Sequence, residues 1–369
     1  MKRKNISILM LLLIIIGCSR EEKAQRKYDE TIMVYIYQTI QPGNPTENIL
    51  DKIAAGVHKD ANVIVAYANQ KEIQFFQMNG ENSKIYLGEE TNEGKYITYG
   101  HKLLLQKVMS DYPSKKYQSV FIGESSAPST EKEDVIPSMG VGKNRLSFYL
   151  FTSNFYGEKR INPKRMDYAV IIASSFGDPN VIYAFGDFVP YVVASPTEID
   201  LRHYPYKEMF DALTTPQISI KEKLEKGCKE YLSHAETNHL DGSISLYDCT
   251  QFDFASQRFS NINISNDKDL IKNNLSSTNL TKLGDHNYQF DFIEMINSSY
   301  NENDSKVLKY EFEKSIIMYG FSGKWTNKNL CGLGVYVPHK DLIRRYIISY
   351  TMCWNGMTDY RNLVNNIYR

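Results

Sequence analysis

Little in the sequence suggests a cross-linked, metal-binding or nucleic-acid-binding protein. Its 369 residues include five cysteines, which is too few for a disulfide scaffold, and neither a CxxC pair nor an HExxH motif is present. The 43 Lys and Arg residues only balance the 43 Asp and Glu residues, so no basic excess exists to neutralise a phosphate backbone. We therefore expect no nucleic-acid partner, no metal site and no cofactor. An apolar share of 42% and a charged share of 23% are typical of a globular protein.

The apolar run at the amino terminus is too short to span a membrane. Residues 8–16 are all apolar and follow Lys2, Arg3 and Lys4. A helix of that length reaches about 13 Å, whereas the hydrocarbon core of a bilayer is roughly 30 Å thick. The pattern predicts a secretory signal. Removal of residues 1–17 leaves 40 basic against 43 acidic residues, so the exported chain is slightly acidic.

The end of this signal predicts a lipid anchor. The signal ends with Gly17 and Cys18, and this ending resembles the lipobox of bacterial lipoproteins. The resemblance implies cleavage before Cys18 and lipidation of that residue. An ordinary signal that contains a cysteine by chance is the alternative. Residues 19–23 are charged, and their basic residue followed by two acids resembles the surface-export signals of Bacteroidetes lipoproteins. We expect a signal at 1–17, a tether at 18–30, and membrane anchoring in the bacterial cell envelope, extending to the outer-membrane surface.

The next part of the chain alternates between strand and helix patterns. Apolar, β-rich runs recur and are separated by segments with the i, i+4 apolar spacing of a helix. The expected strands are residues 31–37, 62–67, 118–122, 168–173 and 191–194, and the expected helices include residues 49–57 and 98–110. Short apolar strands alternating with helices predict an α/β core at residues 31–215, with a mainly parallel sheet flanked by helices.

The pattern of secondary structure expected from the sequence changes after residue 215. A long amphipathic helix is expected at residues 218–234, followed by a strand at 243–247 and a polar Asn/Ser-rich stretch at 260–287. The remaining expected elements are helices at 290–300 and 307–319, a last strand at 331–337, and an aromatic helix through Trp354. We expect residues 216–369 to form an α+β extension packed on the core.

Four stretches resemble one enzyme family. They are residues 31–37, residues 194–199 followed by Tyr204-Pro205-Tyr206, residues 243–248, and residues 332–338 followed by Tyr350 and Trp354. In this order they resemble the clostripain-like cysteine peptidases, whose fold is that of caspases, legumains and gingipains. The resemblance covers nearly all of residues 31–358. It implies a caspase-like fold with a peptide-binding cleft beyond the carboxyl ends of the strands.

The two catalytic positions implied by this resemblance are both replaced. Glu124 stands where the family has its histidine, and Ser175 stands where it has its cysteine. A one-residue gap downstream leaves Ser174 as the other occupant of the cysteine position. A serine hydroxyl needs a base beside it, and a solvated carboxylate is a weak base at neutral pH. The sequence therefore favours a pseudo-peptidase that keeps a cleft for a peptide or protein ligand.

The sequence leaves two alternatives open. One is an active hydrolase that uses Ser175 with Glu124 or His203, and the other is a structural surface lipoprotein whose cleft holds no ligand. The side chains expected in the cleft are those of Ser174, Asp178, Ser195, Glu198, His203 and Tyr206.

Three further residue types each have two interpretations. His203 either points into the cleft or lies on a surface loop, and Asp178 either lines a pocket or belongs to a turn. The cysteines outside the signal form up to two disulfides or remain buried thiols; they are Cys228, Cys249, Cys331 and Cys353.

Overall fold

The structure, a computed structural model, describes most of the chain between Tyr28 and Tyr360. The described residues are 28–37, 46–69, 71–80, 83–91, 98–126, 138–139, 146–147, 152–155, 166–262, 280–284, 289–326, 328–337, 354, 358 and 360. The expected signal, Cys18, most of the expected tether, nearly all of the Asn/Ser-rich stretch, Cys353 and the expected helix before Trp354 lie outside these residues.

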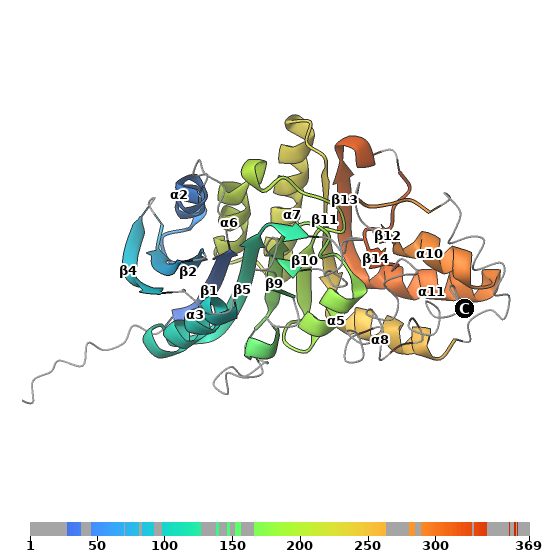
Figure 1. The fold of residues 1–369 in the computed structure, drawn as a ribbon, viewed down its shortest axis with the longest axis horizontal. Helices are drawn as coiled ribbons and strands as arrows, with labels where there is room; N and C mark the ends of the chain where they lie inside the picture. Colours follow the sequence, from blue (N-terminus) through green and yellow to red (C-terminus); the bar gives the residue numbers. More distant parts are fainter. Residues whose placement is uncertain are drawn as a thin grey trace, which may run out of the picture.

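A nine-stranded sheet forms the centre of the molecule, in the order β13-β11-β10-β9-β5-β1-β2-β3-β4 (Figure 1). The five strands from β10 to β2 are parallel to one another, and antiparallel strands extend the sheet on both sides. The strands are β1 (Tyr28–Tyr37), β2 (Asn62–Ala68), β3 (Glu72–Met78), β4 (Lys84–Thr91), β5 (Ser114–Gly123), β9 (Tyr168–Ile172), β10 (Tyr191–Ala194), β11 (Gly242–Asp248) and β13 (Ile316–Ser322). The expected mainly parallel α/β sheet is confirmed.

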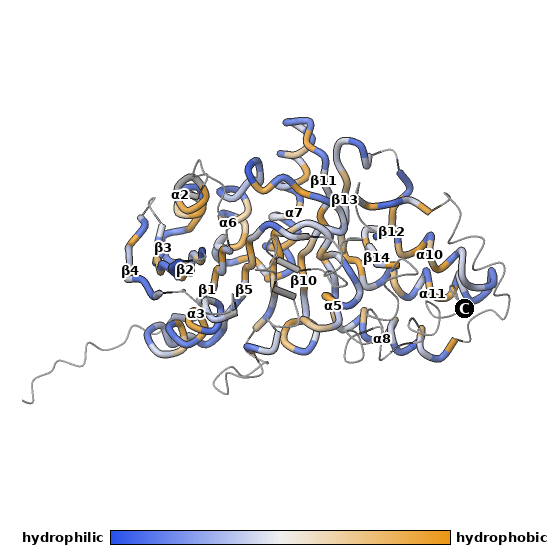
Figure 2. Tube along the Cα trace, in the orientation of Figure 1, coloured by the Kyte–Doolittle hydropathy of each residue, from blue (hydrophilic) through white to orange (hydrophobic). Residues whose placement is uncertain are grey.

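Helices cover both faces of this sheet, which explains why the covered parts of its central strands are apolar on both sides. In β1, Met33 and Tyr35 belong to the core on one face, while Ile32 and Val34 belong to the core on the other. On the first face lie α3 (Thr98–Asp111), α5 (Pro179–Gly186) and α8 (Cys249–Ser260), and on the second lie α2 (Thr46–Gly56), α6 (Tyr206–Thr214) and α7 (Ile220–Thr237). Apolar residues gather in the strands and on the inward sides of these helices (Figure 2).

The C-terminal region packs against α8 and continues the core of the first face. It contains α10 (Phe292–Ser299), α11 (Glu302–Ser315) and a small antiparallel pair formed by β12 (Gln289–Asp291) and β14 (Gly334–Tyr336). Trp354 is buried among the rings of Phe259, Phe292 and Phe312, and its Nε1 donates a hydrogen bond to the hydroxyl of Ser256 (2.7 Å).

The elements differ from the sequence-based expectations at several places. The strands β3 and β4 were not expected, and β13 begins where a helix was expected to continue to residue 319. The strand β1 starts at Tyr28, three residues inside the expected tether. The strands β11 and β13, which lie in the region expected at residues 216–369, belong to the same nine-stranded sheet as β1, β5, β9 and β10.

Short elements complete the part of the chain that the structure describes. They are the strands β6 (Ser125–Ser126), β7 (Ser138–Met139) and β8 (Leu146–Ser147), which form a small separate sheet, and the 3-10 turns η2 (Leu201–His203) and η3 (Gly323–Trp325). Within the described ranges, no helix is both long and apolar enough to cross a bilayer.

Candidate functional site

A pocket of about 700 Å³ lies beyond the carboxyl ends of the central parallel strands. Glu124 and Ser125 follow β5, Ser174 follows β9, and the segment from Glu198 follows β10. Carboxyl ends of parallel strands meet at one edge of a sheet, which is why these residues converge. The pocket is lined by Glu124, Ser125, Ser174, Glu198, Ile199, Asp200, Leu201, Arg202, His239, Leu240, Asp241 and Lys324.

The hydroxyl of Ser174 faces this pocket and is bonded to backbone atoms. It accepts a hydrogen bond from the amide of Ile199 (3.0 Å) and lies 3.4 Å from the carbonyl oxygen of the same residue. The carbonyl oxygen of Ser174 accepts a hydrogen bond from the hydroxyl of Ser125 (2.6 Å). These contacts join the ends of β5 and β9 to the segment after β10. Among the described residues, neither hydroxyl has an imidazole or a carboxylate as its partner.

Ser175, the next residue, faces the interior instead. Its backbone has a left-handed conformation (φ 65°), which is uncommon for a residue other than glycine. Its side chain is fully buried, and its Oγ has no hydrogen-bond partner among the described residues. The backbone of Ser175 is held by the carbonyl of Thr197 (3.0 Å) and the side-chain amide of Gln289 (3.2 Å). Of the two serines considered for the cysteine position, only Ser174 lines the pocket.

Ser195 and Tyr206 support the wall of the pocket from behind. The buried hydroxyl of Ser195 is 3.0 Å from the carbonyl oxygen of Thr197 and 2.9 Å from the hydroxyl of Ser243. The hydroxyl of Tyr206 donates to the carbonyl oxygen of Leu201 (3.0 Å), and burial raises the pKa of Tyr206. Both residues therefore fix the segment that carries Glu198 and Arg202 and do not themselves line the 700 Å³ pocket.

His203 lies on the surface beside the pocket. Its side chain is 60% exposed, and its Nδ1 is 2.8 Å from the carboxylate of Asp200. Arg202 pairs with the same carboxylate (3.3 Å). Partial burial acts to raise the pKa of Asp200, but the hydrogen bonds from His203 and Arg202 outweigh it and hold that pKa below its usual value. The surface-loop interpretation of His203 is the one that the structure supports.

Asp178 lies in the interior, at the N-terminus of α5, and is not among the residues that line the pocket. Its Oδ1 accepts hydrogen bonds from the amide and the side chain of Asn180 (2.9 and 2.8 Å), which caps the helix that Pro179 begins. The side chain is fully buried. Burial raises the pKa of Asp178 to about 6, although the hydrogen bonds from Asn180 and an interaction with the backbone of Tyr336 act in the opposite direction. Asp178 is thus a helix cap in the interior.

Negative charge predominates in the pocket. Four carboxylates line it, those of Glu124, Glu198, Asp200 and Asp241, against two permanent cations. Arg202 pairs with Asp200, and Lys324 lies 3.8 Å from Asp241. Glu198 has no cation partner within the part of the chain that the structure describes.

The far wall of the pocket was not expected from the sequence. His239 and Asp241 lie on the turn between α7 and β11, and Lys324 lies on η3 after β13. These residues come from segments more than a hundred positions after Glu124, and no local pattern marks them. The nearest local signal is the polar run after α7, which ends at Gly242 and contains a left-handed residue, His239 (φ 55°).

No group of three or more metal-ligating side chains occurs among the described residues. The three cysteines that the structure describes are free thiols: Cys228 and Cys249 are buried, and Cys331 is partly buried. Burial raises the pKa of Cys228 to about 12 and also raises the pKa values of the other two thiols. Such thiols are poor nucleophiles.

Comparison with known proteins finds the same architecture in solved structures. An inactive zymogen of a C11 protease from Parabacteroides distasonis aligns with a TM-score of 0.70 at 16% identity, over 90% of this chain and 99% of that one. A secreted C11 cysteine protease from Bacteroides thetaiotaomicron, iotapain, aligns with a TM-score of 0.71 at 14% identity, over 90% and 100%. This chain has the fold of the C11, or clostripain-like, cysteine proteases. No family model and no curated protein matches the sequence itself.

The caspase-like fold predicted from the four sequence stretches is therefore confirmed. A further structure of the secreted protease from Bacteroides thetaiotaomicron, in complex with an irreversible peptide inhibitor, aligns with a TM-score of 0.69 at 14% identity over 90% of this chain and 99% of that one. In the clostripain-like fold of the present chain, Glu124 and Ser174 lie together at one pocket, whereas Ser175 is turned away from it.

Proposed function

We propose that this chain is a lipid-anchored pseudo-peptidase that binds a peptide or protein segment in the pocket beyond β5 and β9. The observation that carries the proposal is the state of the two hydroxyls in the pocket. Those of Ser125 and Ser174 are bonded to backbone atoms, and Glu124 stands where the resemblance to clostripain-like peptidases implies a histidine.

The chemistry of these groups supports binding over hydrolysis. A serine becomes a nucleophile when an adjacent base takes its proton, and an amide leaving group needs a proton in return. Glu124 is solvent-exposed, and a carboxylate is in general a weaker base than the imidazole of the histidine that the resemblance implies at this position. Ser175, the serine of the hydrolase alternative, is fully buried, and its Oγ has no hydrogen-bond partner among the described residues, so no base is bonded to it there.

The open volume supports a ligand over a purely structural role. A chain that had lost every use for the cleft is expected to fill it with side chains, yet about 700 Å³ remain open. Its excess of carboxylates favours a ligand that carries positive charge. The related fold of the secreted Bacteroides thetaiotaomicron protease accepts a peptide inhibitor, which makes a peptide the first ligand class to test.

The expected anchor suits a cleft that faces away from the membrane. The strand β1 begins at Tyr28, ten residues after the lipidation site expected at Cys18. Because β1, β5 and β9 are parallel, Tyr28 lies at the sheet edge opposite to Glu124 and Ser174. A strand of this length spans about 33 Å, so the pocket is held that much farther from the tether.

Restoring the two catalytic side chains tests the proposal. We expect the double variant Glu124→His with Ser174→Cys to react with a thiol-directed peptide probe and to gain cleavage of chromogenic lysine or arginine substrates. The matched control is Glu124→His with Ser175→Cys, which buries the thiol and is expected to remain inactive. The unmodified chain should show neither reaction.

Two results would contradict the proposal. Cleavage by the unmodified chain that is lost in Ser174→Ala would identify an active serine hydrolase. A lysine-containing peptide that binds equally well to the unmodified chain and to Glu198→Lys would show that the acidic pocket is not its binding site.

A further inference from the structure

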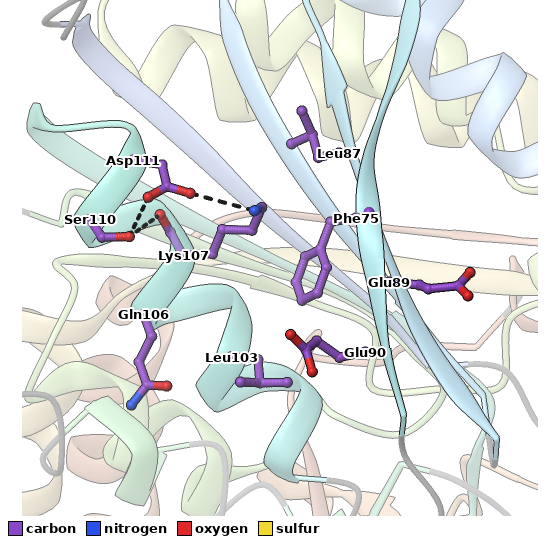
Figure 3. A pocket seen from close by; sticks show the side chains of 10 residues that line it. Phe75, Leu87, Glu89, Glu90, Leu103, Gln106, Lys107, Ser110 and Asp111 are labelled. Carbon is purple, nitrogen blue, oxygen red and sulfur yellow. Dashed lines mark hydrogen bonds and ion pairs between the residues drawn. The ribbon is translucent and has the colours of Figure 1, made fainter. Parts of the chain in front are cut away.

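A second hollow, of about 510 Å³, lies at the opposite end of the sheet from the C-terminal region. Figure 3 shows it between α3 and the edge hairpin of β3 and β4. Phe75 of β3, Leu87 of β4 and Leu103 of α3 provide its apolar surface. It shares no lining residue with the pocket at Glu124 and Ser174. We call it the β4 groove.

The groove exists because α3 does not reach the edge of the sheet. This helix packs on β1 and β2, and it presents its outer side, with Leu103, Gln106 and Lys107, toward β4. Among the described residues, the other helices on this face, α5 and α8, contact β10 and β11 toward the other end of the sheet, so no helix beyond α3 covers β4 here. Leu87 is consequently only partly buried, although the neighbouring Phe75 is almost fully covered.

The strand that borders the groove also has an open backbone edge. β4 pairs with β3 on one side, and it is the last strand of the sheet in the part of the chain that the structure describes. Its side chains Ile85 and Tyr86 are 43% and 53% exposed. Unpaired backbone groups on an exposed edge strand form the template on which an extended chain adds a further strand.

The charges at the groove select the side chain that such a strand would carry. Lys107 is paired with Asp111 (3.4 Å), and Glu89 accepts a hydrogen bond from the hydroxyl of Tyr86 (2.9 Å) and points away from the groove. Glu90 points into the groove below Phe75 (Figure 3) and has no cation partner among the described residues. A carboxylate beside an apolar surface suits a lysine or arginine, whose aliphatic stem packs while its charge reaches the acid.

We propose that the β4 groove is a docking site for an extended, cationic peptide segment. The segment adds as a strand along β4, and a basic side chain enters the groove, with its stem against Phe75 and Leu103 and its charge at Glu90. The site is independent of the proposed cleft function, because the strand order separates β4 from β5 and β9 by β3, β2 and β1.

A fluorescent peptide of about seven residues that alternates lysine and valine is a suitable probe, since strands of this length are common in sheets. With the full purified chain, we expect saturable binding, measured by fluorescence anisotropy, that weakens as the salt concentration rises. Glu90→Gln should weaken it by about two- to fivefold, as for an exposed ion pair, and Glu90→Lys more strongly. Glu302→Lys, an exposed substitution on α11, is the matched control and should not change the affinity.

The backbone part of the proposal has its own test. The same peptide with N-methyl groups on alternate amides keeps its charge but cannot pair with an edge strand, and it should lose binding. Equal binding of the methylated peptide would overturn strand addition. An affinity that is unchanged in Glu90→Lys and falls in Glu198→Lys would place the peptide in the cleft and overturn the β4 groove. Absence of binding up to about 1 mM would also overturn it.

Discussion

Replacement of Asp178 by asparagine should remove a pH dependence from the stability of the fold. The carboxyl group is fully buried at the N-terminus of α5, and burial raises its pKa from 3.8 to about 6. The folded chain therefore binds this proton more tightly than the unfolded chain does. The contribution of this group to the free energy of unfolding is most favourable when the group is protonated in both states. That contribution falls as the pH rises from about 3.8 through 6.

The size of the effect follows from the two pKa values. An ionised Asp178 costs the folded state about 3 kcal/mol at pH 8, because one pKa unit corresponds to about 1.4 kcal/mol. About half of that cost is already present at pH 5, so about 1.4 kcal/mol should develop between pH 5 and pH 8. The asparagine side chain in the Asp178→Asn variant would keep an oxygen that accepts the amide of Asn180 and would carry no charge.

Urea unfolding of the unmodified chain and of Asp178→Asn, followed by circular dichroism at pH 5 and pH 8, measures this directly. The stability of the variant relative to the unmodified chain should increase by about 1.4 kcal/mol between the two pH values. Asp187→Asn, an exposed carboxylate at the other end of α5, is the control and should leave the pH dependence in place. A relative stability that is the same at both pH values within about 0.5 kcal/mol would refute the assignment of a buried, weakly ionised carboxyl group.

The remaining predictions concern the anchor and the long helix of the second face. Cys18→Ser should move the protein from the membrane fraction to the soluble fraction, and radiolabelled palmitate should no longer be incorporated; labelling that persists would place the lipid elsewhere. Ser219→Ala should lower the free energy of unfolding by about 1 kcal/mol, because the hydroxyl of Ser219 and the carboxylate of Glu222 cap the start of α7 reciprocally. Ser219→Thr should retain most of this stability, and an equal loss in both variants would count against the cap.

The strands that could be read from the sequence are those buried on both faces. The residues from Ile32 to Tyr37 in β1 and from Val63 to Ala68 in β2 are all apolar because helices cover both faces of these strands, and such runs are visible without an alignment. β3 and β4 alternate polar and apolar residues at a half-covered edge, and β4 contains Gly88 and two glutamates, which weaken the pattern. These two strands were missed for that reason.

The end of α11 shows how pairing overrides a local pattern. The apolar spacing at Leu308, Phe312 and Ile316 is compatible with one helix that continues to residue 319, which is what the sequence predicted. The helix ends at Ser315, because the following residues pair with β11 along its open edge. The partner strand lies about 70 positions earlier, so the local sequence carries no sign of it.

The sequence by itself determined the features that depend on local composition, which are the apolar strands and the α/β class. It also predicts the export signal and the positions at which a histidine and a cysteine are replaced. Only the tertiary structure decided between Ser174 and Ser175, because the left-handed backbone at Ser175 turns one side chain inward and leaves the other at the pocket. The tertiary structure also decided which residues form the far wall of the pocket. His239, Asp241 and Lys324 reach it because β11 and β13 pair in the common sheet. A pocket is a property of strand order, and strand order is set by long-range pairing that no short stretch of sequence encodes.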